Sequence, residues 1–236
     1  MEFLVLFVAV GLGAVVQGSV GFGLALVVVP AMTLVSPEAL PATVLLLTMP
    51  MASVMAARER HAIYAPGLVY LLSGRLLGTL GGLGLLLLVP DDYLSVLFGS
   101  LVVVAALASS SNPKIDLSNR TRVAGGIVSG VMGTAAGIGG PPLALIYQNR
   151  EEQEIRATLA VAFAMGTAIS LLVLALAERV GLDHLLLALE LLPALLLGLW
   201  GAGFTAKLLS GRWLRLALLL FAAVSGFAAV LLGIAG

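Results

Sequence analysis

Long apolar stretches without a charged side chain recur along this chain, and they restrict what it can fold into. Several run for about 20 residues, and as helices rising about 1.5 Å per residue they would cross a hydrocarbon core of about 30 Å. Of the 236 residues, 61% are hydrophobic and 10% are charged, whereas about a quarter of an ordinary soluble domain is charged. So much apolar surface needs lipid as its solvent. We therefore predict an all-α integral membrane protein whose surroundings are a lipid bilayer.

Hydropathy divides the chain at prolines, glycines and charged clusters into eight apolar segments. These segments cover residues 3–35, 38–57, 66–89, 92–109, 122–148, 155–178, 184–206 and 212–235. A polar stretch separates the first four from the last four. The sequence thus predicts one membrane domain made of a first repeat at 1–109, a linker at 110–121 and a second repeat at 122–236.

Glycine-rich runs interrupt the first and the fifth segments, and the first is too long for one straight span. The first is cut by Gly18–Gly23 and the fifth by Gly133–Pro142. Glycine weakens a helix and proline removes a backbone donor. Each run therefore predicts a break in the helix inside the membrane.

The two halves can be laid over one another at a shift of about 116 to 120 residues. The run Gly21-Phe22-Gly23 then falls on Gly137-Ile138-Gly139, and Glu38 falls on Glu154. Further on, Gly78 falls on Gly198. The same order of landmarks in both halves indicates an internal duplication.

Loop charges predict how the halves are oriented. If all eight segments crossed the membrane, the basic loop residues would divide almost evenly between the two sides. If the first and fifth segments instead enter, break and return, every basic loop residue except Arg179 falls on one side, and Asp91 falls on the other. The positive-inside rule favours this second arrangement. Each half is then a glycine-broken re-entrant hairpin plus three spanning helices, which makes the repeats inverted and places both termini outside.

The two breaks predict a binding site between them, because non-helical backbone at membrane depth is tolerated only against protein or a water-filled cavity. A helix that resumes after a break presents unpaired N–H groups and the positive end of its dipole, which suits an anion. Gln17, Ser19 and Thr134 lie beside the breaks and offer side-chain donors. The alternative is that these glycines only allow helices to pack closely.

Two charged residues lie well inside predicted spans, Arg75 and Glu190. Such residues are costly in hydrocarbon and usually face a cavity or a partner. Arg75 is a candidate for binding the anion, and Glu190 is a candidate proton carrier or charge partner of Arg75. The alternatives are a purely structural ion pair, or side chains that reach to the nearer interface. The candidate substrate-binding residues are Gln17, Gly18, Ser19, Gly21, Phe22, Gly23, Arg75, Gly133, Thr134, Gly137, Gly139, Gly140 and Pro141.

Several functional classes lack their residues in this chain. It has no cysteine and only two histidines, so we expect no metal site. It carries no phosphate-binding Walker motif and no catalytic triad pattern, so we expect neither a cofactor nor enzymatic activity. The net charge is zero without a basic run, so we expect no nucleic-acid partner. Homo-oligomer formation is left open.

These motifs resemble those of a known family. The run Gly18–Gly23 with Pro30, and the run Gly133–Pro142 with Glu154–Thr158, are similar to those of the TauE/SafE sulfite exporter family, also called the toluene sulfonate uptake permease family. The resemblance covers nearly the whole chain. It implies an inner (plasma) membrane permease, a secondary transporter for small sulfur-containing anions such as sulfite, sulfonates or sulfoacetate. The functions that compete with this interpretation are a passive anion channel and a non-transporting membrane scaffold.

Overall fold

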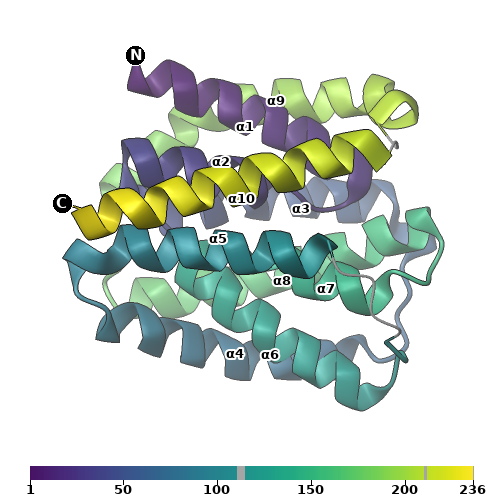
Figure 1. Cartoon of the computed structure of the whole chain (residues 1–236). Coiled ribbons are helices and arrows are strands. Elements are labelled where there is room, and N and C mark those ends of the chain that lie inside the picture. Colours follow the sequence, from purple (N-terminus) through teal and green to yellow (C-terminus); the bar gives the residue numbers. More distant parts are fainter. Residues whose placement is uncertain (111–114, 210–211, 236) are drawn as a thin grey trace.

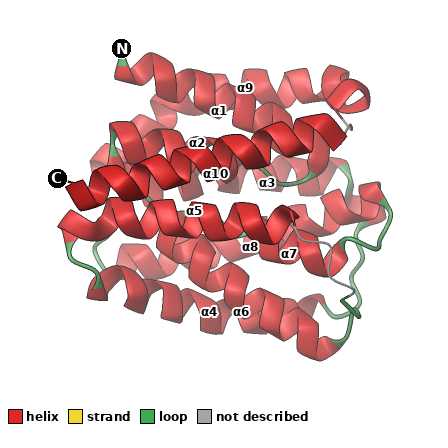
Figure 2. Ribbon diagram, in the orientation of Figure 1, coloured by secondary structure: helices red, strands yellow, loops and turns green. Residues whose placement is uncertain are grey.

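The computed structural model describes residues 1–110, 115–209 and 212–235, and it is built from α-helices joined by short connections (Figures 1 and 2). The helices are α1 (Glu2–Val20), α2 (Leu24–Val35), α3 (Ala42–Arg58), α4 (Leu68–Leu88), α5 (Leu94–Ser110), α6 (Asn119–Ala136), α7 (Gly140–Tyr147), α8 (Glu152–Leu176), α9 (Leu182–Leu209) and α10 (Arg212–Ala235). Single turns of 3₁₀ helix lie at Pro37–Ala39, Arg60–Ala62 and Asp91–Tyr93. The all-helical prediction is confirmed.

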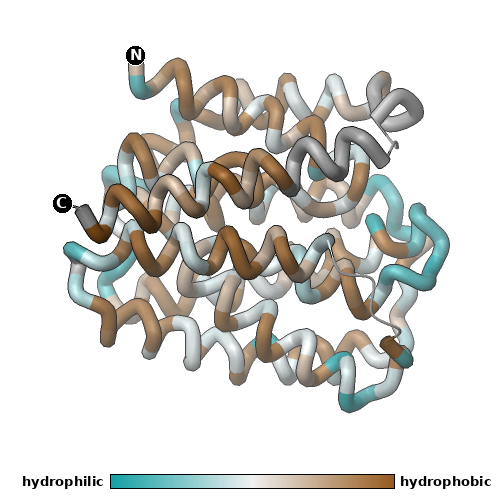
Figure 3. The backbone as a smooth tube through the Cα atoms, viewed as in Figure 1, coloured by the Kyte–Doolittle hydropathy of each residue, from teal (hydrophilic) through white to brown (hydrophobic). Residues whose placement is uncertain are grey.

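Hydrophobic residues are concentrated along the helices, and hydrophilic residues gather mainly at the two ends of the bundle (Figure 3). Helices α1, α4 and α8, and α9 over Leu182–Phe204, are long and apolar enough to cross a membrane. Their outward faces carry large apolar side chains that are more than half exposed, such as Leu77, Leu80, Leu197 and Trp200. Water would not favour so much exposed apolar surface, whereas lipid would. The chain is therefore a multi-pass membrane protein.

The chain reverses direction after α1. Gly21 has a left-handed φ of 96° and ends the helix, and Gly23 has a φ of 132°. Helix α2 then runs back along α1, so that a Cβ at Gly13 would lie 3.0 Å from the carbonyl oxygen of Leu24. We call α1, the break and α2 hairpin 1.

A second reversal follows α6. Gly137 ends that helix with a φ of 77°, and α7 returns along it, since a Cβ at Gly125 would lie 2.9 Å from Ile146. We call α6, the break and α7 hairpin 2. Both breaks are shorter than the glycine runs suggest: they cover only residues 21–23 and 137–139. Gly18, Ser19, Gly133 and Thr134 remain helical, because one left-handed glycine is enough to end a helix.

The long helices of the bundle pack against one another in pairs. Helix α4 packs along α6, α1 along α9, α5 along α10, and α3 along α8. The glycines at 74, 78 and 82 lie against the backbone of α6, where an added Cβ would meet carbonyl oxygens. Gly198 lies in the same way against Gly11. These glycines therefore allow the helices to pack closely.

The connections gather at two ends of the bundle. The N-terminus and the last turn of α10 lie at one end (Figure 1). At the other end, the α3–α4 connection meets the start of α8: Tyr64 N–H donates to Thr158 Oγ1 over 2.9 Å, and the guanidinium of Arg150 lies 3.7 Å from the ring centre of Tyr64. We call this second end the basic end, since Arg58, Arg122, Arg150 and Arg156 all lie there. Lys114 and Gly236, for which the sequence predicts opposite sides, lie outside the described residues.

Candidate functional site

A small cavity lies between the two hairpins, close to both glycine breaks. Its wall includes residues of the first break and its flanks, of the second break and its flanks, and of α3, α4 and α8. The lining residues are Gln17, Phe22, Gly23, Ala25, Leu26, Leu45, Thr48, Arg75, Gly137, Ile138, Gly139, Gly140, Pro141, Phe163 and Thr167. Segments more than 100 residues apart in sequence thus form one cavity. We call it the central cavity.

Gln17 brings an unpaired donor to the central cavity from hairpin 1. Its side chain is 3% exposed, and its Oε1 accepts a hydrogen bond from the N–H of Leu24 across the break, over 3.2 Å. Its Nε2 has no hydrogen-bond partner among the described residues. An unmade hydrogen bond on a buried amide costs about 1–3 kcal/mol, so this amide would gain from an acceptor in the cavity.

Arg75 brings a second donor from α4, and it is 1% exposed. Its Nη1 donates to Ser129 Oγ over 2.6 Å, and that hydroxyl donates to the carbonyl oxygen of Gly139 over 2.7 Å. Its Nε has no hydrogen-bond partner within the described part of the chain. Nor does any described carboxylate lie within ion-pair distance of it. A buried cation without an anionic partner is costly, and an anion in the cavity would offset that cost.

Glycines make room for the Arg75 guanidinium. A Cβ on Gly166 of α8 would collide with Arg75 Nε, one on Gly139 would lie 2.9 Å from Nη1, and one on Gly133 would lie 3.1 Å from Nη2. Glycine at these three positions therefore lets the side chain reach the second break. The guanidinium is held by hairpin 2, α4 and α8 together.

The two helix N-termini at the cavity differ in their capacity to bind an anion. The first four N–H groups of a helix have no partner within that helix. At the start of α2, Ala25 and Leu26 line the cavity and both carry such groups. At the start of α7, Pro141 and Pro142 have no N–H. Hairpin 1 thus offers backbone donors, whereas hairpin 2 contributes by holding the Arg75 guanidinium of α4 through Ser129.

In this conformation the central cavity has a volume of about 20 Å³, which is room for about one water molecule. A group with one sulfur and three oxygens is larger than this. An anion can therefore occupy the cavity only if the hairpins or the helices around them move apart.

The structure places the sequence-predicted residues in three groups. Gln17, Phe22, Gly23, Arg75, Gly137, Gly139, Gly140 and Pro141 line the central cavity. Gly133 lies against the Arg75 guanidinium, Gly21 packs on Arg156, and Gly18 lines a different cavity. The hydroxyl groups of Ser19 and Thr134 bond elsewhere, to the Val15 carbonyl oxygen and to Ser170 Oγ. These two hydroxyls are therefore engaged away from the cavity.

Glu190, the candidate charge partner of Arg75, does not form an ion pair with it in this structure. Glu190 is exposed on α9, whereas the Arg75 guanidinium is buried among α4, α6 and α8. The cause is the register of α9: its buried face at this level carries Ala188 and Leu191, which leaves Glu190 on the outer surface.

Two residues of the site escape the sequence reasoning, Ser129 and Gly166. Neither residue type stands out on an apolar helix, since small residues are common wherever membrane helices pack. The spacing of Ser129 eight residues before Gly137 puts it on the α6 face that α7 covers, which is the one signal that points to it.

The bundle is apolar and helical, and it buries a guanidinium between two broken helices. These features are typical of a multi-pass membrane protein whose interior suits an anion. The chain belongs to the TauE/SafE sulfite exporter family, whose model matches residues 5–229. Membership implies a membrane transporter for sulfur-containing anions. Comparison with curated proteins and with solved structures found no match.

Proposed function

We propose that this protein is a secondary transporter that binds a small sulfur oxyanion, such as sulfite, a sulfonate or sulfoacetate, in the central cavity. One observation carries the proposal: Arg75 and Gln17 line one cavity between the two glycine breaks, and each has a buried side-chain nitrogen, Nε and Nε2, without a hydrogen-bond partner in the described residues. An SO₃ group has three acceptor oxygens and a negative charge. It can accept from both donors and neutralise the guanidinium.

The halves at 1–109 and 122–236 are, in this proposal, inverted repeats joined by the 110–121 linker. The helix pairing supports it: if α1 corresponds to α6 and α4 to α9, the α4–α6 contact corresponds to the α9–α1 contact. Gly78 facing Ile127 then corresponds to Gly198 facing Gly11. In such transporters, movement of one repeat against the other exposes a central site to each side in turn.

The orientation follows from the basic end. Because basic loops stay in the cytoplasm, that end faces the cytoplasm of the plasma membrane and the two termini face outside. Hairpin 1 then enters from outside and hairpin 2 from the cytoplasm. A substrate held between their tips is near the middle of the membrane.

Flux into proteoliposomes tests the proposal. Purified protein should take up radiolabelled sulfite or methanesulfonate, and Arg75→Lys should weaken uptake because a single ammonium cannot bind two oxygens in the fork geometry of a guanidinium. Arg75→Gln should reduce uptake further. Arg60→Gln, on an exposed arginine at the basic end, is the matched control and should transport normally.

Two results would contradict the proposal. Normal uptake by well-folded Arg75→Gln protein would show that the substrate does not bind in this cavity. Uptake that never exceeds the concentration outside, under any imposed ion gradient, would identify a passive channel instead of a transporter.

A further inference from the structure

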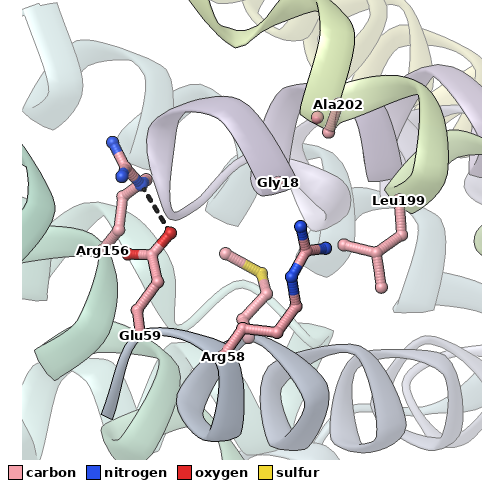
Figure 4. Close-up of a pocket in the computed structure, with 8 residues that line it drawn as sticks. Gly18, Arg58, Glu59, Arg156, Leu199 and Ala202 are labelled. Atoms are coloured by element: carbon pink, nitrogen blue, oxygen red, sulfur yellow. Dashed lines mark hydrogen bonds and ion pairs between the residues drawn. The ribbon is translucent and has the colours of Figure 1, made fainter. Parts of the chain in front are cut away.

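A second and larger cavity lies at the basic end, with a volume of about 110 Å³ (Figure 4). Three charged residues line it, Arg58, Glu59 and Arg156. Its other wall is apolar and comes from α1 and α9, with Gly18 and Leu199. We call it the basic-end cavity. Its volume exceeds the share of about 30 Å³ that one water molecule takes in the liquid, so a group of several heavy atoms fits.

The charges of the basic-end cavity do not cancel. Arg156 Nε donates to Glu59 Oε1 over 3.1 Å, and this pair is neutral. Arg58 is exposed and has no acidic partner among the described residues. Figure 4 shows its guanidinium extending from α3 toward Gly18 and Leu199. The cavity thus carries one uncompensated positive charge on a side chain that solvent reaches.

The tip of hairpin 1 separates this cavity from the central one. Gly18, in the last turn of α1, lines the basic-end cavity, whereas Gln17, Phe22 and Gly23 line the central cavity. Arg156, which also lines the basic-end cavity, packs against this tip, since a Cβ at Gly21 would lie 2.9 Å from its Cγ. One short segment of backbone is therefore a wall of both cavities.

We infer that the basic-end cavity is a second binding site for a small sulfite- or sulfonate-type anion, with Arg58 as its charged ligand. The inference rests on the proposed function, because it adds a waiting site on the path to the central cavity. The anion binds there through the fork of the Arg58 guanidinium, with two oxygens on two N–H groups. Its organic part, where it has one, lies on the apolar wall.

A cysteine at position 203 tests this site without any transport. Gly203 lines the cavity, and a Cβ added to it meets no atom within 4 Å. The chain has no other cysteine. The Gly203→Cys protein in detergent is treated with two methanethiosulfonate reagents of similar size, one ending in a sulfonate and one in a trimethylammonium group. The measurement is the ratio of their modification rates, each relative to the rate with a free thiol.

We expect the sulfonate reagent to react about tenfold faster, because a cationic cavity concentrates anions. Adding Arg58→Gln should bring the ratio close to one, Arg58→Lys should keep most of it, and methanesulfonate should slow the modification in a saturable manner. Arg60→Gln, two residues away, should leave the ratio unchanged. A cysteine placed at Gly181, outside this cavity, should give a ratio that does not depend on Arg58.

Three results would overturn the inference: a ratio that Arg58→Gln does not change, no protection by methanesulfonate, or no modification by either reagent. If Arg58→Gln protein does not fold, protection in the protein that keeps Arg58 decides. The proposed function fails separately, through normal flux in Arg75→Gln protein. The two outcomes are therefore distinguishable.

Discussion

Glycines 21, 23 and 137 each have a φ between 77° and 132°, in a region where a side chain costs on the order of 1–2 kcal/mol. They shape the two breaks from which the central cavity is built. Their sequence signal is strong because glycine runs interrupt otherwise apolar helices. Gly166 gave no such signal, since its role is to leave space for the Arg75 side chain from another helix, and no local pattern records that.

Alanine at Gly21, Gly23 or Gly137 should lower the rate of flux severalfold while the protein stays folded, because the strain is small for the fold but displaces the donors beside each break. Flux and size-exclusion profiles of each variant check this. Gly84→Ala is the matched control, since a Cβ there meets open space. Wild-type flux in all three variants would show that the breaks do not shape the site.

At the scale of elements, the glycine face of α4 against α6 holds Arg75 in place. Gly74 and Gly78 on α4 and Gly126 and Gly130 on α6 bring the backbones so close that an added Cβ would meet backbone atoms. Arg75 lies in the middle of this contact. The four-residue spacing of these glycines is typical of closely packed membrane helices. The sequence prediction overestimated the length of both breaks, because glycine frequency does not tell which glycine takes the left-handed conformation.

Gly78→Val should destabilise the protein by about 1–3 kcal/mol, the usual cost of overpacking a tight contact. Thermal unfolding in detergent measures it, and Gly84→Val should unfold close to the wild-type temperature. Equal unfolding temperatures for the two variants would mean that α4 and α6 do not pack as described.

At the scale of the whole molecule, the proposed repeats match in helix pairing but differ at the central cavity. With the proposed repeat alignment, Arg75 corresponds to Leu195 and Gln17 to Gly133. The sequence supports the proposed duplication because the landmarks keep the same order in both halves. The asymmetry is harder to interpret from sequence, since only the fold shows that both unmatched donors, Arg75 and Gln17, face the same cavity.

Single cysteines at positions 114 and 150 should be labelled by a membrane-impermeant maleimide only from the cytoplasmic side, and cysteines at 1, 91 and 236 only from outside. The physical reason is that hairpin 2 enters and leaves through one face. Labelling of 114 and 150 from opposite faces would mean that this segment crosses the membrane, which contradicts the inverted arrangement.

The location of the bound anion is the central claim, and selenite measures it directly, because it has the shape and charge of sulfite and selenium scatters anomalously. Protein co-crystallised with selenite should show an anomalous peak between the two hairpins, with selenite oxygens within about 3 Å of Arg75 Nε and Gln17 Nε2. The peak should be absent from crystals of Arg75→Gln protein grown in the same way. Selenite bound elsewhere, with no density between the hairpins in a protein that transports it, would contradict the site.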